Sequence, residues 1–137
     1  MSTTEAKANV HERVRRQHAS ELAQDYVEAI DELARSGRVI RVSDLQEVFG
    51  VSHVTVIRTL QRLEEQGLLE SAKSKEIALS EDGKALASEA AGRHALLVEF
   101  LCHIGVSPEQ ADADAEGAEH HLSKETMSAI RRFLDRA

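Results

Sequence analysis

Acidic and imidazole side chains recur at helical spacing toward the C-terminal end of this 137-residue chain. Within residues 116–121, EGAEHH, the side chains of Glu116, Glu119 and His120 stand at positions i, i+3 and i+4. On a helix these three share one face, where the two carboxylates repel each other. A divalent cation would offset this repulsion, so the spacing is typical of a metal site, although acid pairs on helices are more often simply solvated.

Three more residues could complete such a site. Asp25 and Glu28 stand three residues apart on an earlier predicted helix. His94 is the polar member of a helical stripe whose other members, Leu97 and Leu101, are apolar. Taken one at a time, these residues are more often solvated acids or a hydrogen-bonded core histidine. Carboxylates and histidines on several helices that share one small core are a stronger signal than any one member. The candidate metal ligands are Asp25, Glu28, His94, Glu116, Glu119 and His120.

The ligand types narrow the choice of metal. Carboxylates with imidazoles suit Mn²⁺ or Fe²⁺, and Zn²⁺ and Co²⁺ compete by raw affinity. We expect His121 to face another side, behind the ligands or in solvent, and Cys102 to be a buried, inert thiol. The sequence contains no HExxH motif, and it lacks the paired Glu-x-x-His motifs of di-iron bundles.

A second group of residues indicates contact with DNA. Between Ser52 and Leu63 the chain carries Arg58 and Arg62 and no acidic residue, on a predicted helix that Ser52 caps. The exposed face of such a helix fits the major groove, although two arginines also occur on ordinary solvated faces. The net charge of −7 disfavours a nucleic-acid ligand, but the acids gather elsewhere, above all in residues 107–121. The candidate DNA contacts are Ser52, His53, Thr55, Arg58 and Arg62, with Lys73 and Lys75 on a following hairpin.

The periodicity of apolar residues predicts the elements that position both groups. A helix from Ser20 precedes a short helix that Ser43 and Gln46 cap, and a tight turn then leads to the helix capped by Ser52. A small two-stranded hairpin, or wing, follows over residues 68–79. With 3% aromatic residues and a single proline, the composition favours a mainly α-helical chain. The predicted helices cover residues 20–36, 43–49, 52–66, 80–104, 107–121 and 123–137.

The composition also limits where the chain can work. No apolar run approaches the roughly 20 residues needed to cross a bilayer, and the N-terminus lacks the apolar core of a secretory signal. A lone cysteine cannot form an intrachain disulfide, which fits a reducing cytoplasm. We expect residues 1–19 to form a flexible N-terminal extension, residues 20–91 a DNA-binding domain, and residues 92–137 a second helical domain. The extension carries Lys7, Arg13, Arg15 and Arg16, so contact with DNA is the alternative to a solvated arm.

The chain resembles a known family of metal-dependent transcription factors over about residues 21–133. The similarity rests on DYVE at 25–28, RVSDL at 41–45, the pair RH at 93–94, and above all EGAEHHLS at 116–123. In these features the chain is similar to the diphtheria-toxin-repressor family, and specifically to its manganese-transport regulator branch. The resemblance implies a mainly α fold, in which a winged helix-turn-helix DNA-binding domain precedes an all-helical metal-binding and dimerisation domain. It also implies a binuclear metal site at the six candidate ligands.

The same resemblance implies a metal and a function. The iron-sensing branch has methionine where this chain has Glu28 and cysteine where it has Glu119, so the oxygen ligands here imply Mn(II), two ions per subunit. Fe(II), Zn(II) or Co(II) could replace it in vitro. The expected protein is a cytoplasmic homodimer that represses manganese-uptake genes by binding a palindromic operator in double-stranded DNA. It would have no membrane partner, no organic substrate and no enzymatic activity. Since His53-Val54-Thr55 departs from the family's usual Pro-Thr at the start of the recognition helix, the operator sequence does not transfer.

Two other functions fit part of the pattern. A metal-dependent hydrolase or oxidase would use a dinuclear carboxylate site, yet the sequence shows no nucleophile motif and no phosphate loop. A winged-helix regulator of an organic ligand would leave the carboxylates solvated, and replacing Asp25 and Glu119 by alanine would then leave regulation intact. The dependence of DNA affinity on Mn²⁺ separates both from a metal-activated regulator.

Overall fold

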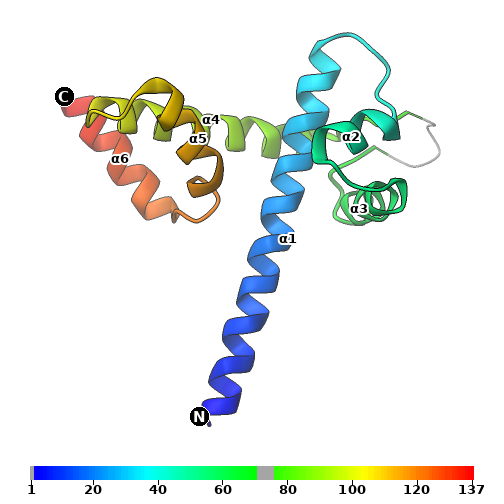
Figure 1. Ribbon diagram of the computed structural model, residues 1–137, viewed down its shortest axis with the longest axis horizontal. Helices are drawn as coiled ribbons and strands as arrows, with labels where there is room; N and C mark the ends of the chain where they lie inside the picture. Colours follow the sequence, from blue (N-terminus) through cyan, green and yellow to red (C-terminus); the bar gives the residue numbers. More distant parts are fainter. Residues whose placement is uncertain (1, 71–75) are drawn as a thin grey trace. The chain divides into compact units, whose positions relative to one another are not determined.

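The computed structural model describes residues 2–70 and 76–137, and it is mainly α-helical, as the sequence predicts (Figure 1). The chain forms two compact units, residues 1–87 and residues 88–137, which we describe separately. Helix α4 begins in the first unit and continues in the second. None of the helices in the described ranges has the length and hydropathy that a membrane span requires. The helices are α1 (Thr3–Arg35), α2 (Val42–Phe49), α3 (His53–Glu65), α4 (Glu81–His103), α5 (Pro108–Ala118) and α6 (Lys124–Arg136).

The first unit contains the predicted helix-turn-helix, formed by α2 and α3. Helix α2 ends at Gly50, whose φ of 63° lies in the left-handed region that glycine adopts without strain. Tyr26 of α1, Leu45 of α2 and Leu63 of α3 are buried in one core, and the ring of Tyr26 stacks on Phe49 with centroids 4.1 Å apart. This packing turns one side of α3 inward and leaves its other side in solvent.

Serine side chains begin three of the helices, as predicted. The hydroxyl oxygens of Ser52, Ser107 and Ser123 each accept a hydrogen bond from the backbone N–H three residues later, at 3.2, 3.3 and 3.1 Å. Each cap satisfies one of the N–H groups that a helix leaves without an internal partner. The starts of α3 and of the acidic helix α5 are therefore fixed by local sequence.

The start of α2 differs from the prediction. The helix begins at Val42, and the carboxylate of Asp44 accepts a hydrogen bond from the N–H of Arg41 at 2.9 Å. The predicted pairing of Ser43 with Gln46 is therefore wrong. Asp44 stands three residues after Arg41, so its short side chain reaches back to the first amide of the helix.

The wing is present in the described residues as two antiparallel segments. A bridge joins Leu69 to Leu79, and the N–H of Glu70 donates to the carbonyl of Ala78 at 2.8 Å. The predicted DNA contacts at positions 73 and 75, both lysines, lie outside the described residues. The base of the wing is thus the part of it that the structure describes.

Helix α4 passes very close to the base of the wing at Gly83. A Cβ atom at this position would lie 2.0 Å from the carbonyl oxygen of Leu68. The N–H of Gly83 donates to the hydroxyl of Ser80 at 3.1 Å, which caps the helix. Because any side chain would meet backbone here, the close approach requires glycine.

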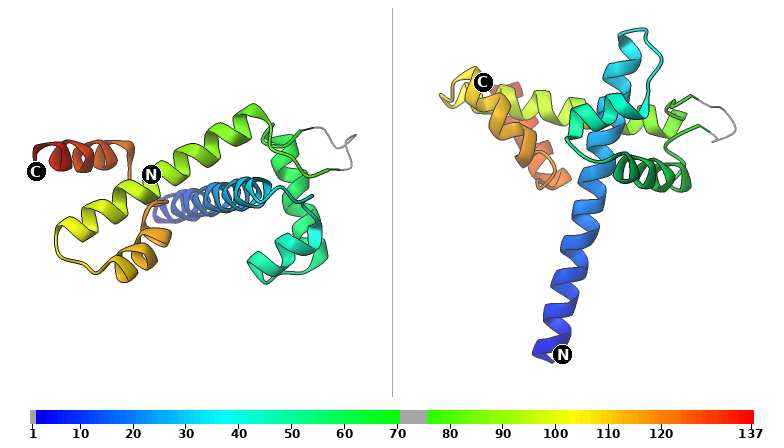
Figure 2. Two further views of the ribbon diagram at one scale, coloured as in Figure 1. Left: turned by 90° about the horizontal axis from the view of Figure 1, so that it is seen from above. Right: turned by 45° about the vertical axis from the view of Figure 1, so that its right-hand side comes forward.

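The N-terminal extension is helical, which corrects the expectation of a flexible arm. Helix α1 begins at Thr3 rather than near Ser20. The hydroxyl of Ser2 accepts from the N–H of Glu5, and the Glu5 carboxylate accepts from the N–H of Ser2, at 3.2 and 3.0 Å. The apolar pattern missed this stretch because it packs on no core. A capped run of good helix formers needs no apolar stripe to continue an existing helix. Figure 2 shows the stretch extending beyond the rest of the first unit.

The second unit consists of α5, α6 and the C-terminal part of α4. Helix α5 ends at Ala118, short of the predicted end near His121. Phe133 of α6 is 48% exposed and meets the ring of Phe100 edge-on with centroids 5.8 Å apart. It lies at the edge of a small core that other residues fill. The buried core residues are Leu96, Leu97, Ala115, Met127 and Ile130.

Candidate metal centre and DNA-binding surface

The second unit brings the four candidate ligands of residues 88–137 into one group. The Nδ1 atom of His94, on α4, lies 2.8 Å from a carboxylate oxygen of Glu119 and 3.6 Å from one of Glu116. The Nε2 atom of His120 lies 3.5 Å from the other oxygen of Glu119. Glu119 follows the last residue of α5 as its C-terminal cap, and its backbone is still in the right-handed helical region. The i, i+3 spacing from Glu116 therefore holds across the end of the helix.

The group combines acidic charge with burial. The side chain of Glu119 is 2% exposed, that of His120 5% and that of His94 22%. A buried carboxylate is costly unless cations or hydrogen-bond donors compensate it. Two imidazoles lie beside Glu119, and a metal ion is a stronger compensating charge than either. Burial and ligand type together suit a cation-binding site.

Asp112 belongs to this group, and the sequence analysis missed it. One of its oxygens lies 2.8 Å from Nε2 of His94, on the side of the ring opposite Glu119. A carboxylate on the far nitrogen of a metal-binding histidine holds the ring in one orientation and raises its basicity. The available signal was the spacing of Asp112 and Glu116, which is i, i+4 and continues the acidic face of α5.

The surroundings of His94 also change its pKa. Desolvation of the ring lowers the pKa, but the hydrogen bonds with Asp112 and Glu119 and the negative charges of Glu119 and Glu116 outweigh it. The net effect is a pKa of His94 above its ordinary value. The same carboxylates that favour a proton on this ring would favour a metal cation beside it.

Arg93 holds the end of α5 in place. Its Nη2 donates hydrogen bonds to the backbone carbonyls of Glu119 and Leu122, the latter at 3.0 Å. Glu119 caps the C-terminus of α5, where a cation is favourable, and Leu122 lies in the turn that leads to α6. The turn that carries Glu119 and His120 is therefore fastened to α4 beside His94. The sequence pattern gave no sign of this contact.

The remaining two candidate ligands lie in the first unit. Asp25 and Glu28 are partly buried on α1, three residues apart. Their convergence with the group around His94 stays a prediction. Over residues 2–70 and 76–137, no three His, Cys, Asp or Glu side chains are grouped as the ligands of one ion would be. The donor set fits a hard divalent cation by its chemistry, since it offers carboxylate oxygens and imidazole nitrogens and no thiolate. Cys102 is partly buried and carries a free thiol.

The candidate DNA contacts on α3 share its solvent face. All five described members of the set are exposed, whereas Val56, Thr59, Leu60 and Leu63 are buried on the opposite side. Val54, which the prediction omitted, is 56% exposed at the start of the same helix. An apolar side chain there could contact a thymine methyl group in the major groove. The exposed members are Ser52, His53, Thr55, Arg58 and Arg62.

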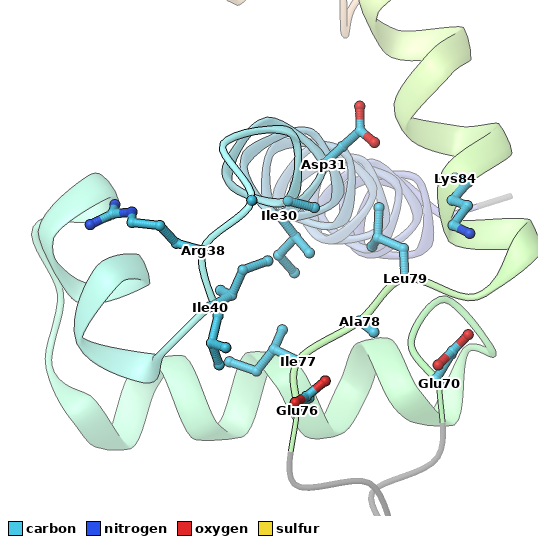
Figure 3. Close-up of a pocket in the computed structure, with 13 residues that line it drawn as sticks. Ile30, Asp31, Arg38, Ile40, Glu70, Glu76, Ile77, Ala78, Leu79 and Lys84 are labelled. Carbon is cyan, nitrogen blue, oxygen red and sulfur yellow. The ribbon is translucent and has the colours of Figure 1, made fainter.

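The first unit also contains a cavity of about 320 Å³ at the base of the wing (Figure 3). The apolar side chains of Ile40, Ile77 and Leu79 line it, and charged groups such as Arg38 and Lys84 stand around it. None of the candidate metal ligands or DNA contacts borders this cavity in the described residues. It is therefore separate from the site that the sequence predicts.

Comparison with known proteins matches the two parts of the chain to two different domains of one family. Residues 18–77 match the N-terminal DNA-binding domain of the iron dependent repressor family. Residues 80–137 match the metal binding and dimerisation domain of the same family. The chain is 43% identical over 123 residues to the transcriptional regulator MntR of Escherichia coli O6:H1, which covers 90% of this chain and 79% of that protein. It is 36% identical over 107 residues to the regulator MntR of Oceanobacillus iheyensis, which covers 78% of this chain and 73% of that one.

Solved structures agree with these matches. A manganese-dependent transcriptional repressor in complex with manganese superposes with a TM-score of 0.73 and 30% identity, covering 82% of this chain and 52% of that chain. ScaR with bound Zn²⁺ superposes with a TM-score of 0.72 and 25% identity, covering 84% and 54%. The chain thus spans about half the length of these solved proteins. The chain belongs to the iron-dependent repressor family, also called the diphtheria-toxin-repressor family: it is a metal-dependent transcriptional regulator similar to MntR, not an enzyme.

Proposed function

We propose that the protein is a cytoplasmic, Mn(II)-activated repressor of manganese-uptake genes, which binds a palindromic operator as a homodimer. The observation that carries the proposal is the grouping of His94, Glu116, Glu119 and His120 in the part of the chain that matches a metal-binding domain. Two Mn(II) ions per subunit would be held by six side chains. These are Asp25, Glu28, His94, Glu116, Glu119 and His120.

The donor set favours manganese over softer metals. Four carboxylates and two imidazoles suit a hard or borderline cation, and the set contains no thiolate or thioether to select copper or to hold iron in the manner of the iron-sensing branch. A related repressor was solved in complex with manganese, and another relative with Zn²⁺. We therefore propose that the protein responds to Mn(II) rather than to the other divalent metals in the cell.

The six ligands come from both domains, so metal binding could control how the two domains are arranged. Asp25 and Glu28 belong to the segment that matches the DNA-binding domain, and the other four belong to the metal-binding and dimerisation domain. Without a cation the four carboxylates repel one another, and two divalent ions balance their charge. Metal binding would then favour one arrangement of the two domains, with two α3 helices about one DNA turn apart. Moving such an equilibrium from mostly inactive to mostly active takes about 5.5 kcal/mol of differential metal affinity.

The exposed face of α3 would read the operator. Arg58 and Arg62 are one helical turn apart and suit guanine edges or phosphates, and the capped N-terminus at Ser52 presents backbone N–H groups to a phosphate. His53 and Thr55 complete the contacts of the helix. Lys73 and Lys75 would add backbone contacts from the wing.

The test is a metal titration of DNA binding with the full chain. A duplex selected from a random pool in the presence of Mn²⁺ serves as probe, and its affinity is measured with Mn²⁺, Fe²⁺, Zn²⁺, Mg²⁺ and a chelator. We expect tight binding with Mn²⁺ and weak binding with the chelator. Glu119→Gln should abolish the difference, whereas Glu109→Gln, an exposed acid on the same helix, should keep it. Equal affinity with and without metal would refute the switch and favour a regulator that senses an organic ligand.

A further inference from the structure

Residues 3–19 of α1, the N-terminal arm, form a helix with almost no protein around it. All of them are exposed except Gln17. An isolated helix of this length is marginal in water, so an arm of this kind gains stability when a partner covers it. The question is what that partner is.

The arm is cationic in an otherwise acidic chain. It carries Lys7, Arg13, Arg15 and Arg16 against two acids, whereas the whole chain has a net charge of −7. Both acids are engaged within the arm. Glu5 closes the capping box, and Glu12 forms a 2.6 Å ion pair with Arg16.

Lys7 and Arg15 share one side of the arm with two histidines, whereas Arg13 lies on another side. Lys7, His11, Arg15 and His18 follow one another at intervals of four, four and three residues, which places them on one face of the helix. No acid of the arm lies on this face, and the stripe ends where Nδ1 of His18 lies 4.0 Å from the carboxylate of Glu21. The arm therefore presents a cationic stripe about three turns long.

The arm extends past the level of α3, away from α2. The buried residues of α3 pack into the core shared with α1 and α2, so its exposed residues face away from α2. In Figure 1 and in the right-hand view of Figure 2, α3 lies between α2 and the level that the arm reaches.

We propose that the N-terminal arm binds the phosphate backbone of the DNA that flanks the contact made by α3. The charge of the stripe complements a polyanion, and the arm extends from the same unit that carries the exposed face of α3. Pairing with the arm of a second copy is disfavoured, because two like-charged stripes repel. This inference rests on the DNA binding of the proposed function, and it adds a contact outside the part of the fold that reads bases.

The experiment compares salt dependence on two lengths of DNA. With Mn²⁺ present, the affinity of the full chain is measured over a range of KCl, on the selected duplex alone and on the same duplex extended by about one helical turn at each end. The test variant is Lys7→Gln with Arg15→Gln. Its matched control is Lys124→Gln with Arg136→Gln, which removes the same charge from exposed positions of α6. Glutamine is a good helix former, and circular dichroism verifies that the helix content is kept.

The expected change follows from counterion release. Each phosphate contact contributes about 0.9 to the slope of log affinity against log salt, so losing two contacts should reduce the slope by about 1.8. At about 0.1 M salt this corresponds to up to about 8-fold in affinity for each contact. The loss should appear on the extended duplex and be much smaller on the short one, and the control should keep the full slope.

Two results would overturn the inference. One is an unchanged slope on the extended duplex. The other is a shift toward monomer in sedimentation, either of the arm variant or of Val14→Asn, while the salt dependence of DNA affinity stays unchanged. That result would show that the arm packs against a second copy of the chain. Failure of the proposed function is distinguishable, because it appears as metal-independent affinity of the unmodified chain, whatever the slope of the arm variant.

Discussion

Replacing Arg93 by methionine tests whether the fastening of α5 to α4 serves metal binding. The methionine keeps an unbranched apolar stem and removes the guanidinium, so both hydrogen bonds to the carbonyls of Glu119 and Leu122 are lost. A hydrogen bond that involves a charged group contributes about 1.5–3 kcal/mol. Because two such bonds share one donor group, we expect the second unit to lose about 2–4 kcal/mol of stability rather than the full sum.

Arg93→Met should also lower metal affinity, because the turn after α5 would no longer be held in one conformation. Glu119 and His120 lie in the segment that Arg93 holds, and fixing the backbone of one residue costs about 1–2 kcal/mol. If metal binding must order these two residues itself, the free energy of Mn²⁺ binding should weaken by about 2–4 kcal/mol, or roughly 30-fold to 700-fold in affinity. Removing a positive charge acts in the opposite direction, since the guanidinium repels the metal. We expect the loss of order to outweigh this repulsion.

The assay measures unbound Mn²⁺ by electron paramagnetic resonance during titration, and thermal unfolding with a chelator present. Arg131→Met, which removes an exposed arginine of α6, is the control, and it should bind Mn²⁺ like the unmodified chain. Arg93→Lys can donate to one carbonyl and should fall between the two. If Arg93→Met lowers the unfolding temperature but leaves Mn²⁺ affinity unchanged or higher, Arg93 is structural only and the reasoning is refuted.

Three further changes probe other contacts. Asp112→Asn replaces the charged acceptor at Nε2 of His94, and we expect Mn²⁺ affinity by calorimetry to fall about 10-fold to 100-fold; an unchanged affinity would show that Asp112 does not orient the ring. Metal binding requires a neutral His94, whose pKa lies above its ordinary value. Mn²⁺ affinity should therefore fall by about ten-fold per pH unit below that raised pKa. In Asp112→Asn this fall in affinity should begin at a lower pH. An onset at the same pH in both proteins would contradict this. Gly83→Ala should destabilise the first unit by about 2 kcal/mol in urea unfolding, because the added Cβ would meet the carbonyl oxygen of Leu68. A gain in stability of up to about 1 kcal/mol, the usual helix preference for alanine over glycine, would show instead that the backbone shifts to make room.

Local rules predicted most of the helix boundaries. The serine caps of α3, α5 and α6 lie where the sequence placed them, because a cap depends only on residues within one turn. The cap of α2 was misassigned since two polar residues there could each serve, and geometry decided for Asp44. The helical arm was missed for a related reason. Apolar periodicity detects helices that pack on a core, and the arm packs on none.

The shared face of Glu116, Glu119 and His120 could be predicted because it depends on spacing along one helix, whereas the contacts of Asp112 and Arg93 could not. Asp112 reaches His94 across 18 residues, and Arg93 reaches Glu119 across 26, so both contacts exist only once α4 and α5 have packed. Geometry at a metal is set by such supporting contacts as much as by the ligands themselves. It follows that a chain could keep all six ligands and still bind Mn²⁺ poorly after a change at Arg93 or Asp112. The EGAEHH pattern therefore predicts which cations the group could bind, and we expect the packing of α5 on α4 to determine the affinity.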